Sequence, residues 1–321
     1  MLERLKYWYW KTRSHALCPR WFPKDREAFC RQQFKQQGGE YTLDLEHPKS
    51  FNEKVTWMML YYHDPLMSIC ADKYAVREYI ASKIGEQYLV NLLNVYDRVE
   101  DIDLAALPDR FALKVNWGSG QNIVCHDKTK LDWADAQAKL RKWMRPESNH
   151  YFFNFEWVYK NIRPRIVCEE YVDQMDGEDL RDYKLFCLNG KAAFFYVNID
   201  RYTGETRNFY DLDWNQLPFS NAYPTSSKVI ERPAQLDLMI QLAETLAKPF
   251  PLVRVDFYVI KDQLKTGEMT FYHQAGIEPF HPEEWDYKLG AMFELPKKKM
   301  VHKYAYSDKV VEFSLKDVLH D

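Results

Sequence analysis

The sequence predicts an α+β protein with a largely antiparallel sheet, and three observations support this class. Segments with helical periodicity alternate with short apolar runs, in the order helices, strand–loop–strand, helix, strands, helix, hairpin. Asn189-Gly190 lies between two apolar runs and is a strong signal for a hairpin turn. The 321-residue chain has a mean hydropathy of −0.55. It contains no apolar run of about 18 or more residues, which excludes a multi-span membrane protein.

Residues that commonly begin or end helices support the predicted helices. Residues 1–50 are expected to form short helices that break at Gly38-Gly39. Ser50 and Glu53 have the spacing of a capping box, so a helix is expected to begin there. Further helices are predicted over Asp72–Lys83, which ends before Gly85, over residues 132–145, which are amphipathic, and over Pro233–Lys248, which has proline in its first turn.

The predicted strands are short apolar or alternating runs bounded by turn residues. They are Tyr88–Val95, Phe111–Val115, Asn122–Cys125, Arg165–Val172, Tyr183–Leu188, Ala192–Asn198, Leu252–Ile260 and Glu268–Tyr272. The last two are expected to be joined by a polar turn that ends at Gly267. No internal repeat is visible.

Composition and cysteine usage narrow the class of protein. Only 11 residues are glycine and 16 % are aromatic, which excludes collagen-like and disordered chains. The six cysteines contain no CxxC pair, and the N-terminus lacks the continuous apolar region of a secretion signal. We expect reduced, buried thiols in a cytoplasmic protein; the even count leaves disulfides as the alternative.

Positive charge gathers at both ends of the chain. Residues 1–35 hold nine Lys and Arg against three Asp and Glu, together with several tryptophans, and Lys297-Lys298-Lys299 lies near the C-terminus. Basic residues interleaved with aromatic ones suit the anionic inner face of a membrane. The favoured alternative is a solvated helix with some aromatic side chains on the core. Nucleic-acid binding is not expected, because the net charge of the chain is −3.

Two carboxylates and an arginine are predicted to share one face of a hairpin. Side chains alternate between the faces of a strand, so Arg254 and Asp256 lie on one face, with Glu268 and Thr270 across the turn. Two such carboxylates suit Mg²⁺, which binds few protein oxygens and keeps phosphate oxygens as further ligands. An arginine beside them can stabilise a phosphoryl group in transfer. The alternative, favoured from this segment alone, is an Arg–carboxylate pair on a solvated face.

The segment from Lys114 to Gly120 links two predicted strands through Gly118, Ser119 and Gly120. Small residues let backbone N–H groups approach phosphate oxygens, and the lysine adds a point charge. The segment is neither a Walker A motif nor GxGxxG, since Ile123 stands where the third glycine would be. A plain tight turn is the alternative and the favoured interpretation of the segment alone.

Two further segments carry polar groups that suit a nucleotide or an anion. The strand ending in Glu169-Glu170-Tyr171-Val172 leads into an acidic connector, where backbone groups can meet an adenine edge and a carboxylate can meet ribose. Asp182 and Lys184 follow on one strand face. Arg201 and Arg207 flank a glycine turn and suit an anionic substrate. Solvated loops and surface salt bridges are the alternatives.

Taken in order, several segments resemble the TupA-like ATP-grasp family, whose members are commonly found with surface-polysaccharide genes. They are FNEKVTW, ADKYAVREYI, FALKVNWGSGQNIV, EEYV, DYKLFCLNGK, DRYTGETRNFYDLDW, VRVDFY, GEMTFY and PEEWDYKLG. The resemblance runs from about Phe51 to Gly290 and implies the ATP-grasp fold, in which ATP is held between two α+β subdomains.

The resemblance also implies a division of the chain and roles for its residues. The expected parts are a helical, basic and aromatic N-terminal extension (1–50), a helical or α+β part (51–110), a subdomain with the glycine-rich loop (111–172), a subdomain with the metal carboxylates (173–295) and a basic tail (296–321). Phosphate contacts are implied for Lys73, Lys114, Gly118, Ser119, Gly120 and Lys184, adenine contacts for Glu169, Glu170, Tyr171 and Val172, and a ribose contact for Asp182. Asp256, Glu268 and Thr270 are the implied Mg²⁺ ligands, and Arg254 and Lys184, with Arg201 and Arg207 for the substrate, are the implied catalytic residues.

Three positions depart from the family pattern. Thr270 stands where ATP-grasp sites usually have an asparagine metal ligand, and Trp117 stands where the family often has histidine. His273-Gln274-Ala275-Gly276 replaces a small PGSG-like turn that would border the substrate. A lone histidine such as His273 is more often structural than catalytic.

The resemblance implies an ATP-dependent carboxylate–amine ligase that acts through an acyl phosphate. The expected carboxylate is a hexuronic acid of a capsule, O-antigen or teichuronic-type glycan, nucleotide- or lipid-linked, and the expected amine is an amino acid or small amine. A glycosyltransferase is the alternative; Asp211-Leu212-Asp213 has the spelling of its DxD metal motif. A third reading is a non-catalytic binding protein that keeps the ATP-grasp geometry.

Overall fold

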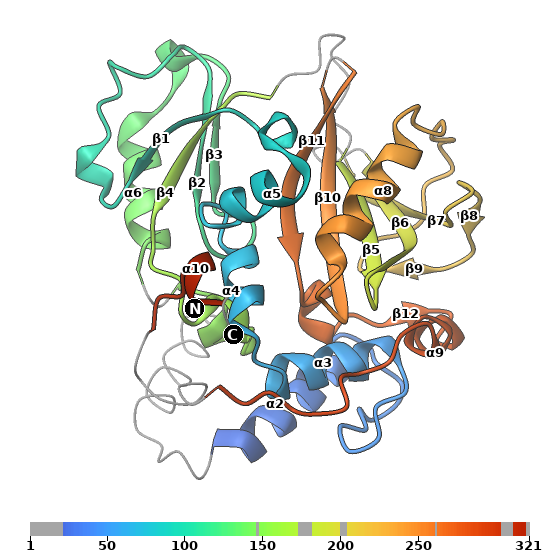
Figure 1. Ribbon diagram of the computed structural model, residues 1–321. Helices are drawn as coiled ribbons and strands as arrows, with labels where there is room; N and C mark the ends of the chain where they lie inside the picture. The colour runs from blue at the N-terminus through green and yellow to red at the C-terminus, as the bar shows by residue number, and fades with distance from the viewer. Residues whose placement is uncertain are drawn as a thin grey trace.

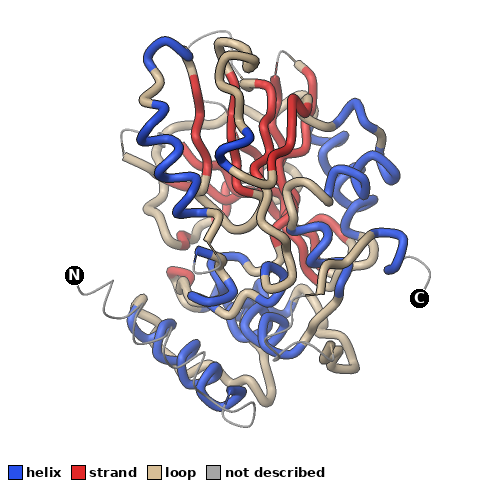
Figure 2. Tube along the Cα trace, turned by 90° about the vertical axis from the view of Figure 1, so that its left-hand side faces the viewer, coloured by secondary structure: helices blue, strands red, loops and turns tan. Residues whose placement is uncertain are grey.

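Two antiparallel sheets lie side by side in the computed structural model, with helices below and between them (Figure 1). The structure describes residues 22–145, 148–172, 182–199, 204–260, 262–302 and 311–318. Figure 2 shows the strands of both sheets in the upper part of the molecule, with most of the N-terminal helices below them. The predicted α+β class and the antiparallel pairing are confirmed.

The smaller sheet has four strands and carries the predicted glycine-rich loop. Its strand order is β1 (Leu92–Tyr96), β4 (Ile166–Glu170), β2 (Phe111–Val115) and β3 (Asn122–Cys125), and α6 (Trp133–Trp143) lies alongside (Figure 1). The strand expected from Tyr88 starts later, because Glu86–Tyr88 form the short 3₁₀ helix η1. β1 comes from the predicted 51–110 part yet pairs with β4, so the small sheet draws on two predicted parts of the chain.

The larger sheet has six strands and carries the predicted carboxylates. Its order is β11 (Gln263–Thr270), β10 (Leu252–Ile260), β5 (Asp182–Leu188), β6 (Lys191–Ile199), β7 (Thr206–Tyr210) and β8 (Gln216–Leu217), and α8 (Leu236–Ala247) packs on it. The predicted turn ending at Gly267 is wrong, because that glycine lies inside β11 where the pairing with β10 shifts. A Cβ there would lie 2.5 Å from the Tyr258 ring, so a larger residue at the bulge would have to displace that ring.

The other elements surround these sheets. They are α2 (Phe22–Gln36), α3 (Phe51–Tyr61), α4 (Pro65–Ala71), α5 (Val76–Ile84), η2 (Val99–Asp101), η3 (Lys128–Lys130), α7 (Tyr151–Asn154), η5 (Trp157–Tyr159), β9 (Ser220–Asn221), η6 (His273–Gly276), β12 (Phe280–His281), α9 (Glu284–Ala291) and α10 (Leu315–Val318). Figure 1 shows α5 between the two sheets. None of the helices in the described ranges is long and apolar enough to cross a membrane.

The capping box that starts α3 is confirmed. The Ser50 hydroxyl accepts the Glu53 backbone N–H at 3.1 Å, and the Glu53 carboxylate accepts the Ser50 N–H at 2.9 Å. The same carboxylate accepts the N–H groups of Asp44 and Lys49. Because Glu53 is buried, these contacts fix the path of the chain into α3 as well as its first turn.

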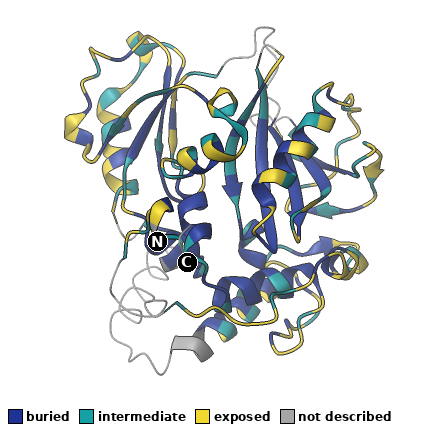
Figure 3. Ribbon diagram, in the orientation of Figure 1, coloured by how far each residue is buried: buried dark blue, intermediate teal, exposed yellow. Residues whose placement is uncertain are grey.

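The buried residues form one core that joins the helices to both sheets (Figure 3). Phe51 of α3 packs against Phe186 and Phe194 of the large sheet, with ring centroids 5.9 and 6.4 Å away. Phe29 and Phe34 turn the apolar side of α2 into the same core. The five cysteines of the described ranges are free and buried, as expected; Cys18 and the tryptophans of residues 1–21 lie outside those ranges.

A left-handed turn after β11 packs closely on α3. Gln274, Ala275 and Gly276 have φ of 49°, 51° and 66°. A Cβ on Gly276 would lie 2.6 Å from the Thr56 hydroxyl and 3.0 Å from the Asn52 carbonyl oxygen. Glycine is therefore required there by both its φ and its neighbours.

Replacing Gly276 by alanine is expected to lower the free energy of unfolding by about 2–4 kcal/mol, from backbone strain and overpacking against α3. Gly38→Ala is the matched control, because Gly38 has a φ of 95° but nothing within 4 Å of a Cβ. It is expected to lose only about 1 kcal/mol. Urea unfolding of both variants measures the difference, and equal losses would contradict the proposed close packing.

A buried carboxylate ties α9 to the start of α3. Asp286 accepts the Asn52 backbone N–H at 2.9 Å and the Asn52 side-chain amide at 2.8 Å, and it accepts the Tyr41 hydroxyl at 2.7 Å. No cation pairs with it among these contacts. Burial therefore raises the pKa of Asp286 to about 6, although these hydrogen bonds work against the rise.

This raised pKa predicts a pH dependence of stability. Between about pH 4 and 6 the folded protein keeps a proton on Asp286 that the unfolded chain has lost, so this group lowers stability as the pH rises through that window. Relative to Asp286→Asn, the wild type is expected to lose roughly 2–3 kcal/mol between pH 4 and pH 7. Urea unfolding across this range measures it; parallel curves for the two proteins would show that the carboxyl titrates normally. Asp237→Asn, at an exposed position, is the control.

Candidate active site

The strand pairing brings the predicted carboxylates together on one face of the large sheet. Asp256 of β10 lies directly opposite Glu268 of β11 and Lys184 of β5, and cross-strand neighbours share a face. Asp256 is fully buried, whereas 31 % of the Glu268 side chain is exposed. The site is therefore closed at Asp256 and open at Glu268.

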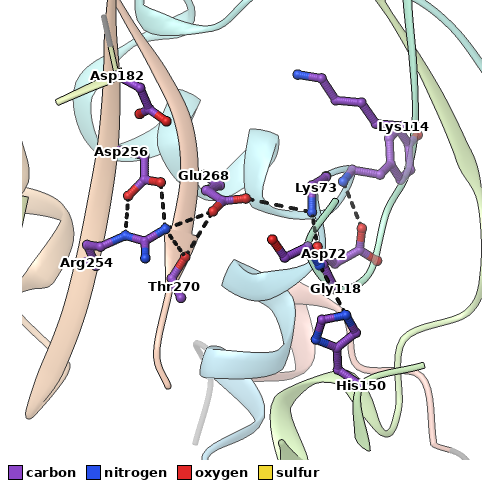
Figure 4. A network of polar contacts seen from close by, with 12 residues as sticks. Asp72, Lys73, Lys114, Gly118, His150, Asp182, Arg254, Asp256, Glu268 and Thr270 are labelled. Atoms are coloured by element: carbon purple, nitrogen blue, oxygen red, sulfur yellow. Dashed lines mark hydrogen bonds and ion pairs between the residues drawn. The ribbon is translucent and has the colours of Figure 1, made fainter. Parts of the chain in front are cut away.

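Arg254 is the centre of this cluster (Figure 4). Its Nε and Nη2 donate to the two oxygens of Asp256 at 2.6 and 2.7 Å. Nη2 also donates to Glu268 Oε1 at 3.0 Å and Thr270 Oγ1 at 3.1 Å, and Nη1 donates to the Tyr196 hydroxyl at 3.1 Å. Because Arg254 and Asp256 are both buried, the solvated-face interpretation of this segment is wrong.

The charges of the cluster compensate one another inside the protein. Lys184 contacts Asp182 at 2.6 Å and also Asp256. Burial lowers the pKa of Lys184, but the two carboxylates raise it above its ordinary value. Burial raises the pKa of Asp256, and Arg254 and Lys184 work against that rise. All four charged groups consequently depend on one another.

Glu268 stays ionised although it borders the buried cluster. Burial raises the pKa of Glu268, but the positive charges of Lys73, Arg254 and Lys184 outweigh burial. The pKa therefore lies well below its ordinary value. Thr270 donates its hydroxyl proton to Glu268 at 3.2 Å. The threonine that replaces the usual asparagine is thus directed at the same carboxylate.

A second charged group lies on the small sheet. Lys114 donates to Glu169 Oε2 at 2.6 Å, and Arg77 of α5 donates to Glu169 Oε1 at 3.2 Å. The Glu169 side chain is only 10 % exposed. It therefore acts as the counter-ion of two cations.

Lys73 connects the two sheets. Its Nζ donates to the Gly118 carbonyl oxygen at 2.6 Å and lies 3.8 Å from Glu268 Oε2, and its backbone N–H donates to the Asn116 carbonyl at 3.0 Å. In Figure 4 the polar contacts run without a break from Asp256 on the large sheet to the glycine-rich loop. One lysine thus faces both halves of the predicted nucleotide site.

The glycine-rich loop has one buried and one open side. Gly118 and Gly120 have φ of 68° and 72°, which favours glycine. Gly118 is buried, whereas Ser119 and Gly120 are exposed. Trp117 is a core residue whose Nε1 donates to the Trp143 carbonyl at 3.2 Å, so it serves packing rather than the open side of the loop.

The predicted adenine segment borders a cavity of about 1290 Å³. Glu170, Tyr171 and Val172 line it from the end of β4. Arg77 of α5 and Lys265 of β11 line it from the other elements. The cavity therefore lies where the ends of both sheets meet α5.

The two predicted substrate arginines have different outcomes. Arg201 lies outside the described residues. Arg207 is buried between the rings of Tyr196 and Tyr223, 4.1 and 4.7 Å from their centroids, and its Nε donates to Asn198 at 2.8 Å. It is held rigidly beside Tyr196, which also contacts Arg254, so the surface-salt-bridge interpretation of Arg207 is wrong.

His273 and the Asp211-Leu212-Asp213 segment both make hydrogen bonds that hold the local structure of the protein. His273 is buried, and its Nε2 lies 3.0 Å from the Asn221 side-chain oxygen. Burial and the nearby Arg254 hold its pKa well below the ordinary range, so the ring is neutral. The DxD spelling is a turn: Asp211 accepts the backbone N–H groups of Asp213 and Asn215 at 3.0 and 2.7 Å.

The sequence analysis did not identify three side chains of this site. Tyr196 lies opposite Lys184 in β6, so its strand position was a usable signal once the pairing was known. Arg77 of α5 is four residues after Lys73, and both lie in the helix predicted over Asp72–Lys83, so this spacing was also a usable signal. His150, which contacts the glycine-rich loop, had no sequence signal.

The sequence profile of the TupA-like ATP-grasp family matches residues 53–294. The chain belongs to this family. Its two sheets are the two halves of an ATP-grasp fold, as the resemblance implied. A comparison with curated proteins found no match.

Solved structures similar to this member of the family include two ligases and a synthetase. D-alanine–D-alanine ligase from Bacillus anthracis, complexed with ATP, is 17 % identical, with 64 % of this chain and 57 % of that chain covered and a TM-score of 0.37. The same enzyme from Helicobacter pylori is 12 % identical, with 76 % and 65 % covered and a TM-score of 0.38. D-cycloserine synthetase is 13 % identical, with 65 % and 64 % covered and a TM-score of 0.37. The chain thus spans less than two thirds of the length of each.

Proposed function

We propose that the protein is an ATP-dependent carboxylate–amine ligase that acts on a uronic-acid-containing saccharide. The observation that carries this proposal is the position of Lys73, between Glu268 of the carboxylate cluster and Gly118 of the loop. A nucleotide bound there would have its phosphates among lysines and its terminal phosphate next to Arg254. Membership in the ATP-grasp family supports the same reaction class.

In this proposal the nucleotide lies along the junction of the two sheets. Adenine would occupy the cavity lined by Glu170, Tyr171 and Val172, which offers backbone groups and apolar contacts. The phosphates would extend toward Lys73 and Lys114. Asp182, the proposed ribose contact, lies beside Lys184 at the start of β5.

The carboxylates fit a magnesium ion. Asp256 and Glu268 both accept from Arg254 Nη2, and carboxylates are the hard ligands that Mg²⁺ prefers, so these two residues would hold the ion. Thr270 Oγ1 is the third oxygen at this point. Bound Mg²⁺ would neutralise phosphate charge and align the terminal phosphate for transfer.

The remaining chemistry falls to the side chains of the chain itself. A substrate carboxylate oxygen would attack the γ-phosphorus of ATP, giving an acyl phosphate and ADP. The amine would then attack the acyl carbon, forming the amide and releasing phosphate. Arg254, fixed by Asp256 and Tyr196, would stabilise negative charge in both steps without having to move.

The acceptor is proposed to be a hexuronic acid of a bacterial surface glycan, with an amino acid or small amine as the second substrate. Arg207, one tyrosine ring away from Arg254, is the proposed anion contact for this acceptor, together with Arg201. A lipid-linked acceptor would place the enzyme at the inner face of the membrane. Since Phe29 and Phe34 of α2 lie in the core, membrane contact is proposed for residues 1–21 and is tested by vesicle flotation with and without them.

Measurement of ADP release tests the proposed function. The protein is incubated with ATP, Mg²⁺ and panels of uronic acids and amines, and the amide is identified by mass spectrometry. ADP release that requires both substrates, together with an amide product, is the expected result. Release of UDP or GDP from a nucleotide sugar without ATP would establish the glycosyltransferase alternative instead.

A further inference from the structure

The glycine-rich loop has a side-chain partner that the proposed reaction does not use. His150, directly before α7, places its Nε2 3.4 Å from the Ser119 backbone nitrogen (Figure 4). Its ring packs on Gly118, where a Cβ would lie 2.6 Å away. On its far side, Nδ1 lies 3.2 Å from Glu156 Oε1. The imidazole thus connects a carboxylate to the loop.

These contacts determine where the proton of His150 lies. The Ser119 N–H can only donate, so Nε2 must accept and carries no proton. Nδ1 therefore holds the proton and donates it to Glu156, whose carboxylate is buried and also accepts the Asn154 side-chain amide at 3.3 Å. This hydrogen-bond pattern requires the Nδ1–H tautomer, and the carboxylate partner holds the ring in that orientation.

Few other charges face this ring from the described residues. Tyr159 of η5 lies 5.7 Å from it, centroid to centroid, and burial raises the pKa of Tyr159 well above its ordinary value, so that phenol stays neutral. Lys73 approaches the loop through the Gly118 carbonyl oxygen. Glu156 is accordingly the anion that can balance a charged His150.

The Ser119 N–H cannot serve His150 and a phosphate at the same time. A loop that holds phosphate does so by directing backbone N–H groups at its oxygens. The exposed side of Ser119 and Gly120, where a Cβ on Gly120 would meet nothing within 4 Å, has room for such an anion. If Ser119 turned to a phosphate, the bare Nε2 lone pair of His150 would face an anion unless it gained a proton.

We propose that His150 is a phosphate ligand of the bound nucleotide and that binding takes up a proton at its Nε2. The Ser119 N–H would exchange its hydrogen bond to Nε2 for one to a phosphate oxygen. Nε2 would gain a proton from solvent, keep it, and donate a hydrogen bond to the same phosphate group. The Glu156 carboxylate would balance the positive charge of the imidazolium. No covalent bond to carbon or phosphorus changes in this step. The inference rests on the proposed function, because it requires a nucleotide at the loop.

Calorimetric titration of the full-length protein with MgADP tests this. In buffers of different ionisation enthalpy near pH 7.5, the wild type is expected to take up as much as about one proton per nucleotide. His150→Gln keeps an acceptor near the position of Nε2 but does not titrate, so its uptake is expected to vanish and its affinity to fall about 10- to 100-fold. Glu156→Gln keeps the imidazole without its counter-ion and is expected to reduce the uptake. His47→Gln, at an exposed position, is the control and should match the wild type.

The calorimetric results distinguish the role of His150 from nucleotide binding itself. Equal proton uptake by the wild type and both His150→Gln and Glu156→Gln would overturn the role of His150 while leaving nucleotide binding intact. Nucleotide binding by the wild type without any uptake would do the same. Failure of the wild type to bind MgADP would overturn the proposed function and this inference together.

Discussion

Replacing Glu268 by glutamine is expected to lower the rate of ADP formation by at least about 100-fold while the protein stays folded. The change removes one negative charge from the proposed magnesium site and leaves an amide of the same size. A loss of about 3 kcal/mol of transition-state stabilisation corresponds to this factor. Because the Glu268 side chain is partly exposed, Lys73 can regain solvation in the variant. Arg254 keeps its two hydrogen bonds to Asp256, so the melting temperature should change little.

The steady-state rate at several Mg²⁺ concentrations measures this effect. Partial recovery at high Mg²⁺ is the expected signature of a lost metal ligand. Glu284→Gln is the matched control, since Glu284 is exposed on α9 and pairs with Lys288 on the surface of the same helix. A Glu268→Gln variant with wild-type activity would show that the carboxylate serves structure alone.

The part of the site within the large sheet could be predicted from the sequence. Arg254 and Asp256 are two residues apart in an apolar strand, and the next run places Glu268 on the same face once the two strands pair. Alternation and antiparallel pairing are local rules, so they hold even though the predicted start of β11 was wrong.

The part of the site between the sheets could not be predicted from such rules. The contacts from Lys73 to Glu268 and from His150 to Ser119 join segments that are distant in sequence and meet only when the core forms. The family resemblance indicated Lys73, because it compares whole chains. It could not indicate His150, which approaches the loop from another segment.

The departures from the family pattern also needed the structure. Trp117, in place of the usual histidine, is buried beside Trp143, while His150 presents an imidazole to the neighbouring Gly118 and Ser119. Thr270 keeps an oxygen directed at Glu268. Comparing these two positions alone with the family pattern suggests that an imidazole and a metal-ligand oxygen are missing. In the structure His150 supplies an imidazole beside the loop, and Thr270 itself supplies an oxygen beside Glu268.

Replacing Asp256 by asparagine is expected to reduce the free energy of unfolding by about 3–5 kcal/mol, in addition to abolishing ADP formation. The asparagine oxygen can still accept from Arg254 Nε. Its amide group, however, would point donors at Arg254 Nη2 and Lys184 Nζ, which both donate to Asp256 Oδ2 in the wild type. Two buried cations would then share too few acceptors.

Urea unfolding of a double-mutant cycle with Lys184→Met isolates the cause. If uncompensated charge destabilises the Asp256→Asn variant, removing the lysine should restore part of the lost free energy, and the two changes should be non-additive by about 0.5–3 kcal/mol. Asp237→Asn, on the exposed side of α8, is expected to change stability by less than about 0.5 kcal/mol. Strict additivity would mean that Lys184 and Asp256 act independently.

The stability cost of Asp256→Asn also explains why Glu268→Gln is the better variant for testing the chemistry. Glu268→Gln alters the same proposed metal site without removing the carboxylate that holds Arg254 in place.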